Sequence, residues 1–204
     1  GRAAGEVAFT YTDSATGCSN TTKGTITVHN LPIVGLSEIE VCVGENITAT
    51  PSTDGVWSSS NDQIATVTNA GIVTGLSEGQ TTLRYTNTAT GCSNITPFAI
   101  IVHPLPVVST SSSVTCVNST ITATPNTGGT WSSSDISIAT ITDGGVITGR
   151  AAGEVAFTYT DSVTGCSNTT IGKMTVYNVP IIGVTSNEVC VGSAIQVTSD
   201  TDGS

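Results

Sequence analysis

The chain has 204 residues, of which 62 are Ser or Thr, and its 15 acidic and 5 basic side chains give a formal net charge of -10. Five scattered Lys and Arg residues cannot neutralise a run of phosphates, which disfavours nucleic acid and anionic lipid surfaces as partners. Only 10% of the residues are charged. Surface helices normally carry many charged residues, so this composition predicts an all-β protein.

The cysteines reveal an internal repeat. They form two evenly spaced sets, in which successive sequence numbers differ by 74: Cys18, Cys92 and Cys166, each within Gly-Cys-Ser-Asn, and Cys42, Cys116 and Cys190. Residues 1–20 match residues 149–168 at 19 of 20 positions. The sequence therefore predicts tandem domains that repeat with a period of 74.

Prolines mark the expected joints between the repeats, at Leu31-Pro32, Leu105-Pro106 and Val179-Pro180. Proline fixes φ and lacks an N–H donor, so it suits a short crossing between sheets. We expect four segments: the C-terminal part of a repeat at 1–30, complete repeats at 31–104 and 105–178, and the N-terminal part of a repeat at 179–204. The two partial segments together are shorter than one repeat, which indicates a piece of a longer array.

Within one repeat, apolar residues alternate with polar or small ones, as in half-buried strands. In the first complete repeat, strands are expected at 47–50, 64–68 and 82–86, followed by a more apolar strand at 98–102. Gly and Asn between these runs predict tight turns. Six or seven short strands in a repeat of this length fit a small antiparallel sandwich.

Several motifs recur in the same order in both complete repeats. In the first copy they are Gly55-Val56-Trp57-Ser58-Ser59-Ser60-Asn61, Ile64-Ala65-Thr66-Val67, Gly71-Ile72-Val73-Thr74-Gly75, Gly79 and the strand through Tyr85. This order resembles the bacterial immunoglobulin-like group 2 repeat, in the cysteine-bearing form of large secreted proteins of Bacteroidetes-type bacteria. The resemblance implies tandem Ig-like antiparallel β-sandwich domains in an extracellular or surface protein, and it does not imply an enzyme.

The cysteines of so polar a chain indicate disulfides formed in an oxidising compartment. We expect pairing within each repeat, Cys42 with Cys92 and Cys116 with Cys166, because each domain then oxidises alone during secretion. A loop of this size would add about 4 kcal/mol of stability in the chain-entropy model. Cys18 and Cys190 are then expected to pair outside this sequence. Pairing of Cys18 with Cys42, across a joint, is the alternative.

One tryptophan per repeat, Trp57 and Trp131, is expected to be a core side chain, together with Tyr85 and Tyr159. A sugar-stacking platform is the lesser alternative for the tryptophans.

No catalytic residue, metal site or cofactor is predicted. The Ser runs after each tryptophan have no histidine in the domain body to act as a base, and the sequence contains no Cys-x-x-Cys motif and no closely spaced cysteine and histidine. The carboxylates are single, so paired acid–base catalysis is not indicated. We interpret Asp54, Asp62 and Glu78 as solvated turn residues, with calcium at a domain joint as a minor alternative.

Asp13-Ser14-Ala15 and Asp161-Ser162-Val163 match the Asp-Ser/Thr-aliphatic motif that Bacteroidetes-type bacteria use for O-glycosylation, and they occupy the same position in the repeat. The middle copy differs, with Asn87-Thr88-Ala89. We therefore expect covalent glycans on Ser14 and Ser162.

The favoured function is a structural, non-catalytic segment of an extracellular fibril, stalk or adhesin shaft, whose partners are copies of itself. No apolar run reaches the length of a membrane-spanning helix, so no membrane insertion is expected within this sequence. Two alternatives remain open: a carbohydrate- or receptor-binding adhesin module, and an accessory array of a secreted enzyme.

Overall fold

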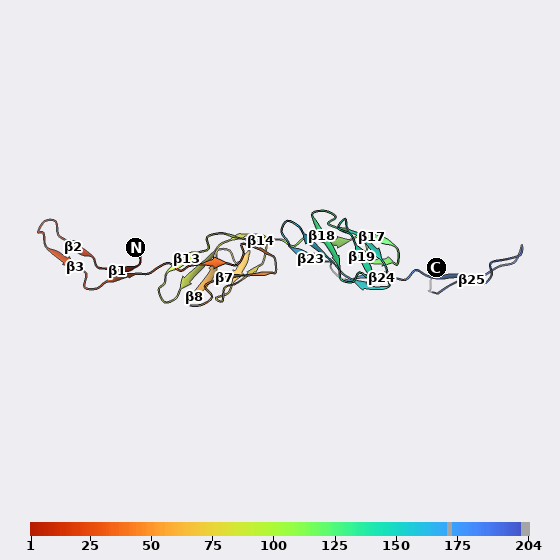
Figure 1. The fold of residues 1–204 in the computed structure, drawn as a ribbon, viewed down its shortest axis with the longest axis horizontal. Helices are drawn as coiled ribbons and strands as arrows, with labels where there is room; N and C mark the ends of the chain where they lie inside the picture. Colours follow the sequence, from red (N-terminus) through yellow and green to blue (C-terminus); the bar gives the residue numbers. More distant parts are fainter. Residues whose placement is uncertain (171–172, 201–204) are drawn as a thin grey trace. The chain divides into compact units, whose positions relative to one another are not determined.

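The structure is a computed structural model that describes residues 1–170 and 173–200, which form strands, turns and loops. In this part of the chain no helix is long and apolar enough to cross a membrane. The chain divides into two compact units, residues 1–104 and 105–204 (Figure 1). The division lies at the joint expected after Pro104. The boundaries expected after Asn30 and Asn178 stay predictions.

The first complete domain is a sandwich of short strands. They are β5 (Gly35–Leu36), β6 (Glu40–Cys42), β7 (Asn46–Thr50), β8 (Gly55–Ser59), β9 (Ala65–Val67), β10 (Ile72–Gly75), β11 (Gly79–Thr81), β12 (Leu83–Asn87), β13 (Ser93–Ile95) and β14 (Ile100–His103). One sheet has the order β5-β7-β10-β9, and the other layer consists of β13-β12-β8 and β11-β14-β6. The pair β6 and β14 is parallel. The two layers and their strand order are those of an immunoglobulin-like sandwich.

The second domain repeats this arrangement, and each strand occupies the same place in the repeat as its counterpart. They are β15 (Ser109–Thr110), β16 (Val114–Cys116), β17 (Thr120–Thr124), β18 (Gly129–Ser133), β19 (Ala139–Ile141), β20 (Val146–Gly149), β21 (Gly153–Val155), β22 (Phe157–Asp161), β23 (Ser167–Thr169) and β24 (Met174–Tyr177). The sheet orders are β15-β17-β20-β19, β16-β24-β21 and β18-β22-β23.

The first domain contains ten strands rather than the six or seven expected, partly because two long strands are interrupted and partly because its first segment forms two short strands, β5 and β6, in different sheets. At the break between β11 and β12, the Thr82 N–H donates to the Ser60 hydroxyl oxygen at 3.0 Å. At the break between β13 and β14, the Thr96 hydroxyl oxygen accepts from the Leu83 N–H at 3.2 Å. Side-chain hydroxyls thus replace backbone acceptors at both breaks, and the regular ladder stops there.

Each domain has its own core, made by the inward side of the alternating strands. In the first domain the buried residues are Val41, Ile47, Ala49, Trp57, Ala65, Val73, Leu83, Tyr85, Ile100 and Val102. In the second they are Ala123, Trp131, Ala139, Ile147, Val155, Phe157, Tyr159, Met174 and Val176.

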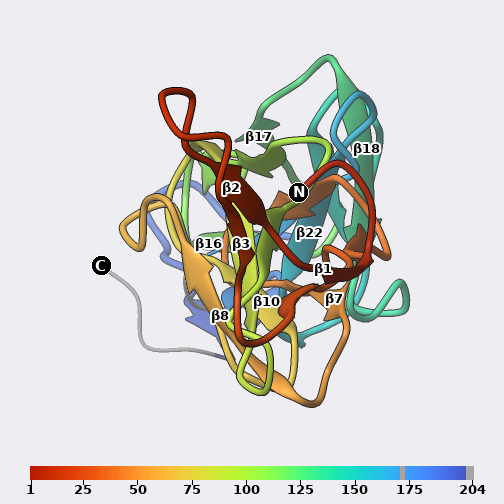
Figure 2. The same cartoon turned by 90° about the vertical axis from the view of Figure 1, so that its left-hand side faces the viewer.

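The flanking segments form two-stranded ribbons without a core of their own. These are β1 (Gly5–Val7) with β4 (Ile26–Val28), β2 (Thr10–Thr12) with β3 (Ser19–Thr21), and β25 (Ile182–Val184) with β26 (Val197–Ser199). The first two are drawn in dark red in Figure 2. Phe9 is 57% exposed, whereas Phe157, its counterpart two repeats further on, is fully buried. The ribbon at 1–30 thus presents side chains that are core residues in a complete domain.

Candidate functional site

The tryptophan and tyrosine expected in the core lie there as a pair. Trp57 and Tyr85 face each other across β8 and β12, with ring centroids 5.2 Å apart and planes tilted by 58°. The Trp57 Nε1–H donates to the Pro51 carbonyl at 2.8 Å, and the Tyr85 hydroxyl donates to the Thr53 carbonyl. Both polar groups therefore hold the loop between β7 and β8.

The second domain repeats this pair. Trp131 donates to the Pro125 carbonyl at 2.7 Å and Tyr159 to the Thr127 carbonyl at 2.8 Å. Burial raises the pKa of the Tyr159 phenol above its usual value, with a smaller effect from the charge of Asp161. Because both rings are buried and bonded to the same loop, they are not available as a stacking platform for sugars.

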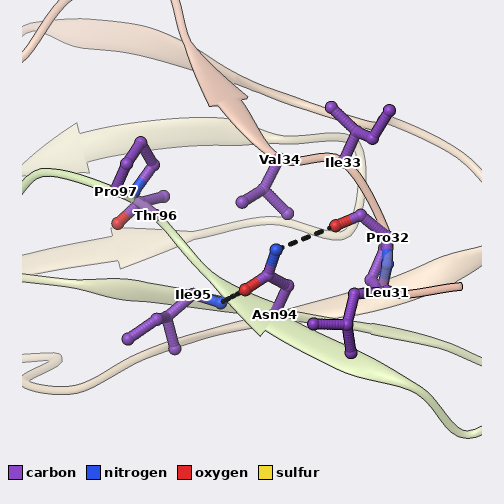
Figure 3. Close-up of a pocket in the computed structure, with 8 residues that line it drawn as sticks. All are labelled: Leu31, Pro32, Ile33, Val34, Asn94, Ile95, Thr96 and Pro97. Carbon is purple, nitrogen blue, oxygen red and sulfur yellow. Dashed lines mark hydrogen bonds between the residues drawn. The ribbon is translucent and has the colours of Figure 1, made fainter. Parts of the chain in front are cut away.

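The linker proline at the start of each domain is held by an asparagine of the Gly-Cys-Ser-Asn motif. Figure 3 shows the Asn94 amide donating to the Pro32 carbonyl, and the distance is 3.0 Å. The other end of the Asn94 amide accepts from the Ile95 N–H, also at 3.0 Å. We call this arrangement the linker clamp.

The linker clamp recurs in the second domain with the same geometry. Asn168 donates to the Pro106 carbonyl at 2.9 Å and accepts from the Thr169 N–H at 2.9 Å. The sequence showed this asparagine as a repeated landmark within Gly-Cys-Ser-Asn, but nothing in its spacing indicated that it binds the linker at the start of its own domain.

A shallow groove lies beside the first linker clamp, between segments 31–34 and 94–97 (Figure 3), with a volume of about 530 Å³. Its lining is largely apolar, and Ile33 is 91% exposed. The only side-chain amide in the groove, that of Asn94, is already bonded on both sides. No carboxylate, histidine or thiol lines it.

The two serines expected to carry glycans lie in identical tight turns. In the turn of Ser162, the Asp161 carboxylate accepts from the Val163 and Thr164 N–H groups, each at 2.9 Å. The Ser162 hydroxyl is exposed and donates to the Gly128 carbonyl at 2.7 Å. The aspartate of the glycosylation motif thus has a structural role of its own.

In the turn of Ser14, the Asp13 carboxylate accepts from the Ala15 and Thr16 N–H groups, each at 2.8 Å. These backbone donors lower the pKa of Asp13, with the Thr16 bond contributing most. Asn87 occupies the same turn in the first complete domain and accepts from Ala89 and Thr90. Asp and Asn are interchangeable there because both supply a side-chain oxygen.

The expected disulfides Cys42–Cys92 and Cys116–Cys166 are not formed, because Cys92 and Cys116 carry free thiols. Cys42 lies beside His103 in the register of β6 and β14, and Val102 of β14 faces Gly79 at the start of β11. Cys92 lies beyond the end of β12, where its carbonyl accepts from the Asn87 N–H at 2.9 Å.

The distance between these positions excludes the expected pairing. The chain continues in the same direction from β11 into β12. Gly79 lies near the Cys42 end of the sandwich and Asn87 lies beside Cys92, and the eight residue steps between them, at about 3.3 Å each, place the two cysteines roughly 25 Å apart. A disulfide requires Cα atoms within about 7 Å. Spacing in the sequence did not show that the two cysteines lie at opposite ends of the sandwich. Cys18 and Cys190 also carry free thiols, and their expected partners lie outside this sequence.

Charged groups form isolated pairs. The His103 ring lies 3.0 Å from the Glu40 carboxylate in the first domain, and Lys173 lies 3.3 Å from Glu154 in the second. Within the described residues no group of three or more His, Cys, Asp or Glu side chains could hold a metal ion.

One outer face of the second domain is covered by hydroxyl groups. β18, β22 and β23 pair so that Ser and Thr lie in two rows across the three strands: Thr130, Thr160 and Ser167, and Ser132, Thr158 and Thr169. We call these six residues the hydroxyl face. Within it, the hydroxyls of Thr158 and Thr169 are 2.8 Å apart, as are those of Thr160 and Ser167.

The corresponding face of the first domain differs. Val56, Arg84 and Ile95 replace Thr130, Thr158 and Thr169, and the Arg84 guanidinium donates to the Ser93 hydroxyl at 3.2 Å. Sequence alternation places these residues outward, but only the register shows that the second domain aligns six hydroxyls.

Residues 40–93, 54 of the 204 residues, match the model of a family described as bacterial Ig-like domain (group 2). Residues 40–93 belong to this family. The match begins in β6 and ends at the first residue of β13, so it includes the tryptophan–tyrosine pair and strands of both layers of the sandwich.

Among curated proteins, the chain is 30% identical over 149 residues to Ice-binding protein 1 of Shewanella frigidimarina. The alignment covers 67% of this chain and 16% of that protein, so the chain spans about a sixth of the relative's length.

Among solved structures, the chain is similar to invasin, a bacterial integrin-binding protein, at 14% identity, with a TM-score of 0.42 over 91% of this chain and 54% of that one. It is also similar to a SusE-like, surface-located polysaccharide-binding protein of Bacteroides thetaiotaomicron at 12% identity. There the TM-score is 0.38 over 85% of this chain and 43% of the other.

Proposed function

We propose that this chain is a non-catalytic, structural segment of an extracellular or cell-surface protein, in which the bacterial Ig-like domains act as spacers of a fibril, stalk or adhesin shaft. The observation that carries the proposal is the repeated linker clamp. Asn94 and Asn168 hold the linker proline of their own domain through the same hydrogen bond, at 3.0 and 2.9 Å.

In a spacer, each domain should connect to its linker in the same way, because the end-to-end length of an array depends on the geometry of every joint. Holding the linker carbonyl against the domain body restricts the backbone at that joint, and proline restricts it further. Recurring side chains with internal hydrogen bonds include the tryptophan and tyrosine, which hold the loop after β7 or β17, and the asparagine, which holds the linker. None of them forms an acid–base pair or a nucleophile with its base.

The test is to delete either complete repeat from the parent protein and to measure the reach of the surface structure by electron microscopy with a tag at its tip. We expect deletion of 31–104 and of 105–178 to shorten the structure equally and to leave the other activities of the parent protein unchanged. Loss of a specific binding or catalytic activity on deletion of only one repeat would contradict the spacer role.

A second candidate function, carbohydrate binding, is favoured by the hydroxyl face of the second domain. Its six hydroxyls are uncharged and aligned in two rows, which matches the chemistry of an ordered polysaccharide surface. The relative from Shewanella frigidimarina is named for ice binding, and ice also presents an ordered lattice of hydrogen-bonding groups.

The matched control for this candidate lies in the same chain. Replacing Thr130, Thr158 and Thr169 by Val, Arg and Ile copies the corresponding face of the first domain onto the second. If the hydroxyl face binds carbohydrate, microcrystalline cellulose or chitin should remove the original chain from solution but leave the triple variant in solution. The incorporation of both proteins into growing ice is measured in the same way. Equal partition of the variant and the original chain on every surface would refute this candidate.

A further inference from the structure

In each sandwich, a strand of the segment that enters the domain lies beside the strand that leaves it, and the two are parallel. In the first domain these strands are β6 and β14. The Ile101 N–H donates to the Ile39 carbonyl at 2.8 Å, and the Val43 N–H donates to the His103 carbonyl at 3.0 Å. Backbone hydrogen bonds therefore join the first and last segments of the domain directly.

The second domain repeats this pairing between β16 and β24. The Thr175 N–H donates to the Ser113 carbonyl at 3.0 Å, and the Val117 N–H donates to the Tyr177 carbonyl at 2.9 Å. Three of these four residues differ from their counterparts in the first domain. The recurring feature is thus the backbone pairing rather than a side chain. We call β6–β14 and β16–β24 the end pairs.

The chain enters and leaves the first domain at opposite ends of the sandwich. At the entry end, Pro32 is bound by Asn94, which follows Cys92 by two residues. At the exit end, His103 lies beside Cys42. A pull on the two ends of the domain therefore draws β6 toward the entry end and β14 toward the exit end.

The direction of a pull decides how the bonds of an end pair are loaded. Strands drawn in opposite directions along their own axes load all their hydrogen bonds at once. Strands opened from one end lose their bonds one after another. In a pull across the domain, β5 detaches before the end pair is loaded, and β5 has only two residues. Further extension then requires the bonds of the parallel end pair to break together.

We propose that the end pairs are load-bearing clamps, which keep each domain folded when the chain is stretched between its ends. Their use in the parent protein rests on the spacer role proposed above, because a shaft that connects a surface to an attachment carries tension. The two proposals fail separately. Deletion of a repeat measures the length of the surface structure, whereas the test below measures the resistance of one domain to force.

The test compares two pulling directions on the full chain, by magnetic tweezers at constant force. In one form, azide-bearing residues at Asn30 and Leu105 are the handles, so the first domain is pulled across its ends. In the other form the handles are at Glu45 and Leu105. Glu45 lies in the exposed turn after β6, so this pull opens the β6–β14 pair from one end. Cys42 and Cys166 are disulfide-bonded, and dithiothreitol is therefore present so that force passes along the backbone alone.

We expect the first domain to unfold at least about fivefold more slowly, at the same force, when it is pulled from Asn30 and Leu105. Unfolding under force is governed by the unfolding rate, and a fivefold change corresponds to one further hydrogen bond of about 1 kcal/mol in the barrier. Equal unfolding rates in the two directions would overturn the proposal, because a clamp must resist one direction more than the other.

Two proline variants separate the clamp from general stability. Val43→Pro removes the donor of an end-pair bond. Thr68→Pro removes the N–H that donates to the Ile72 carbonyl at 2.9 Å, in the turn between β9 and β10. Both should lower the urea midpoint of the first domain.

Under the pull across the ends, we expect Val43→Pro to unfold about fivefold faster than the original chain, and Thr68→Pro to unfold at the original rate. Equal acceleration by the two variants would also overturn the proposal. Near-ultraviolet circular dichroism checks that each variant is folded. If Val43→Pro does not fold, the comparison of the two pulling directions in the original chain decides alone.

Discussion

The turn between β19 and β20 offers a test of how closely this turn packs against β17, a strand of the same sheet. Gly145 has a φ of +74°, and a Cβ atom there would lie far inside van der Waals contact with the Ala123 carbonyl oxygen. The Ala123 N–H donates to the Gly145 carbonyl at 2.7 Å. Any shift that relieves the collision therefore strains the bond that joins the turn to β17.

The expected cost of Gly145→Ala has two parts. A left-handed backbone costs a residue with a Cβ about 1–2 kcal/mol, and an inserted atom in a packed site costs about 1–3 kcal/mol. The sum is about 2–5 kcal/mol. A domain of this length, at about 0.05–0.15 kcal/mol per residue, has roughly 4–11 kcal/mol of total stability. The substitution thus removes a large share of the stability of the second domain.

Gly165→Ala is the matched control. Gly165 has nearly the same φ, +73°, but no atom lies within 4 Å of a Cβ placed there. It should cost only the backbone part, about 1–2 kcal/mol. The difference between the two variants therefore measures the collision with Ala123 and is expected to be about 1–3 kcal/mol.

The assay is differential scanning calorimetry of the full chain, in which the first domain serves as an internal reference. About 4–8 °C of Tm is lost for each kcal/mol in a domain of this size. Both variants should lower the transition of the second domain and leave that of the first unchanged, with the larger shift for Gly145→Ala. Equal shifts for the two variants would show that the close approach to Ala123 carries no energy, and would refute the reasoning.

Three further predictions concern the linker clamp, a turn and the glycans. Asn168→Ala should cost about 1 kcal/mol and speed proteolysis at the linker before the second domain; unchanged cleavage would argue against the clamp. The Ser137 hydroxyl, followed by the Ser137 N–H, lowers the pKa of Asp135 from 3.8, so its stabilisation is present at neutral pH and is lost as the pH falls below 3.8 through the lowered pKa. Asp135→Asn, which copies the residue of the first domain, should weaken this acid dependence in urea titrations, and identical curves would contradict the assignment. Mapping of peptides from native material should find glycans on Ser14 and Ser162, and bare peptides at both sites would remove that prediction.

Much of the architecture could be predicted from the sequence because alternation and turn residues act locally. The strand expected at 47–50 lies within β7, where Ile47 and Ala49 face the core. The interruptions at Thr82 and Thr96 could not be predicted, since each depends on a hydrogen bond to a residue that is distant in the sequence. Their hydrogen bonds join Thr82 to Ser60 and Thr96 to Leu83.

The same limit explains the error in the cysteine pairing. The stretch from Cys42 to Cys92 is a suitable loop for a disulfide on chain entropy alone, and the same stretch recurs in the second repeat. The position of each cysteine in the sandwich decides instead. Cys42 is the last residue of β6 and lies beside the end of β14, whereas Cys92 lies beyond the opposite end, after β12. A sequence period states which residues are equivalent, but it contains no information about which end of a domain they occupy.

The two domains of this chain serve as controls for each other. The shared side chains make internal bonds: the tryptophan and tyrosine hold the loop, and Asn94 and Asn168 hold the linker. Three of the six positions of the hydroxyl face differ from the first domain, as Arg84 of the first domain and Thr158 of the second illustrate. A spacer tolerates such exchanges, because an outward side chain does not alter the core or the clamp. Binding of a ligand to the outer face would change with these side chains. Exchanging the outer-face residues of the two domains therefore tests ligand binding without changing either core.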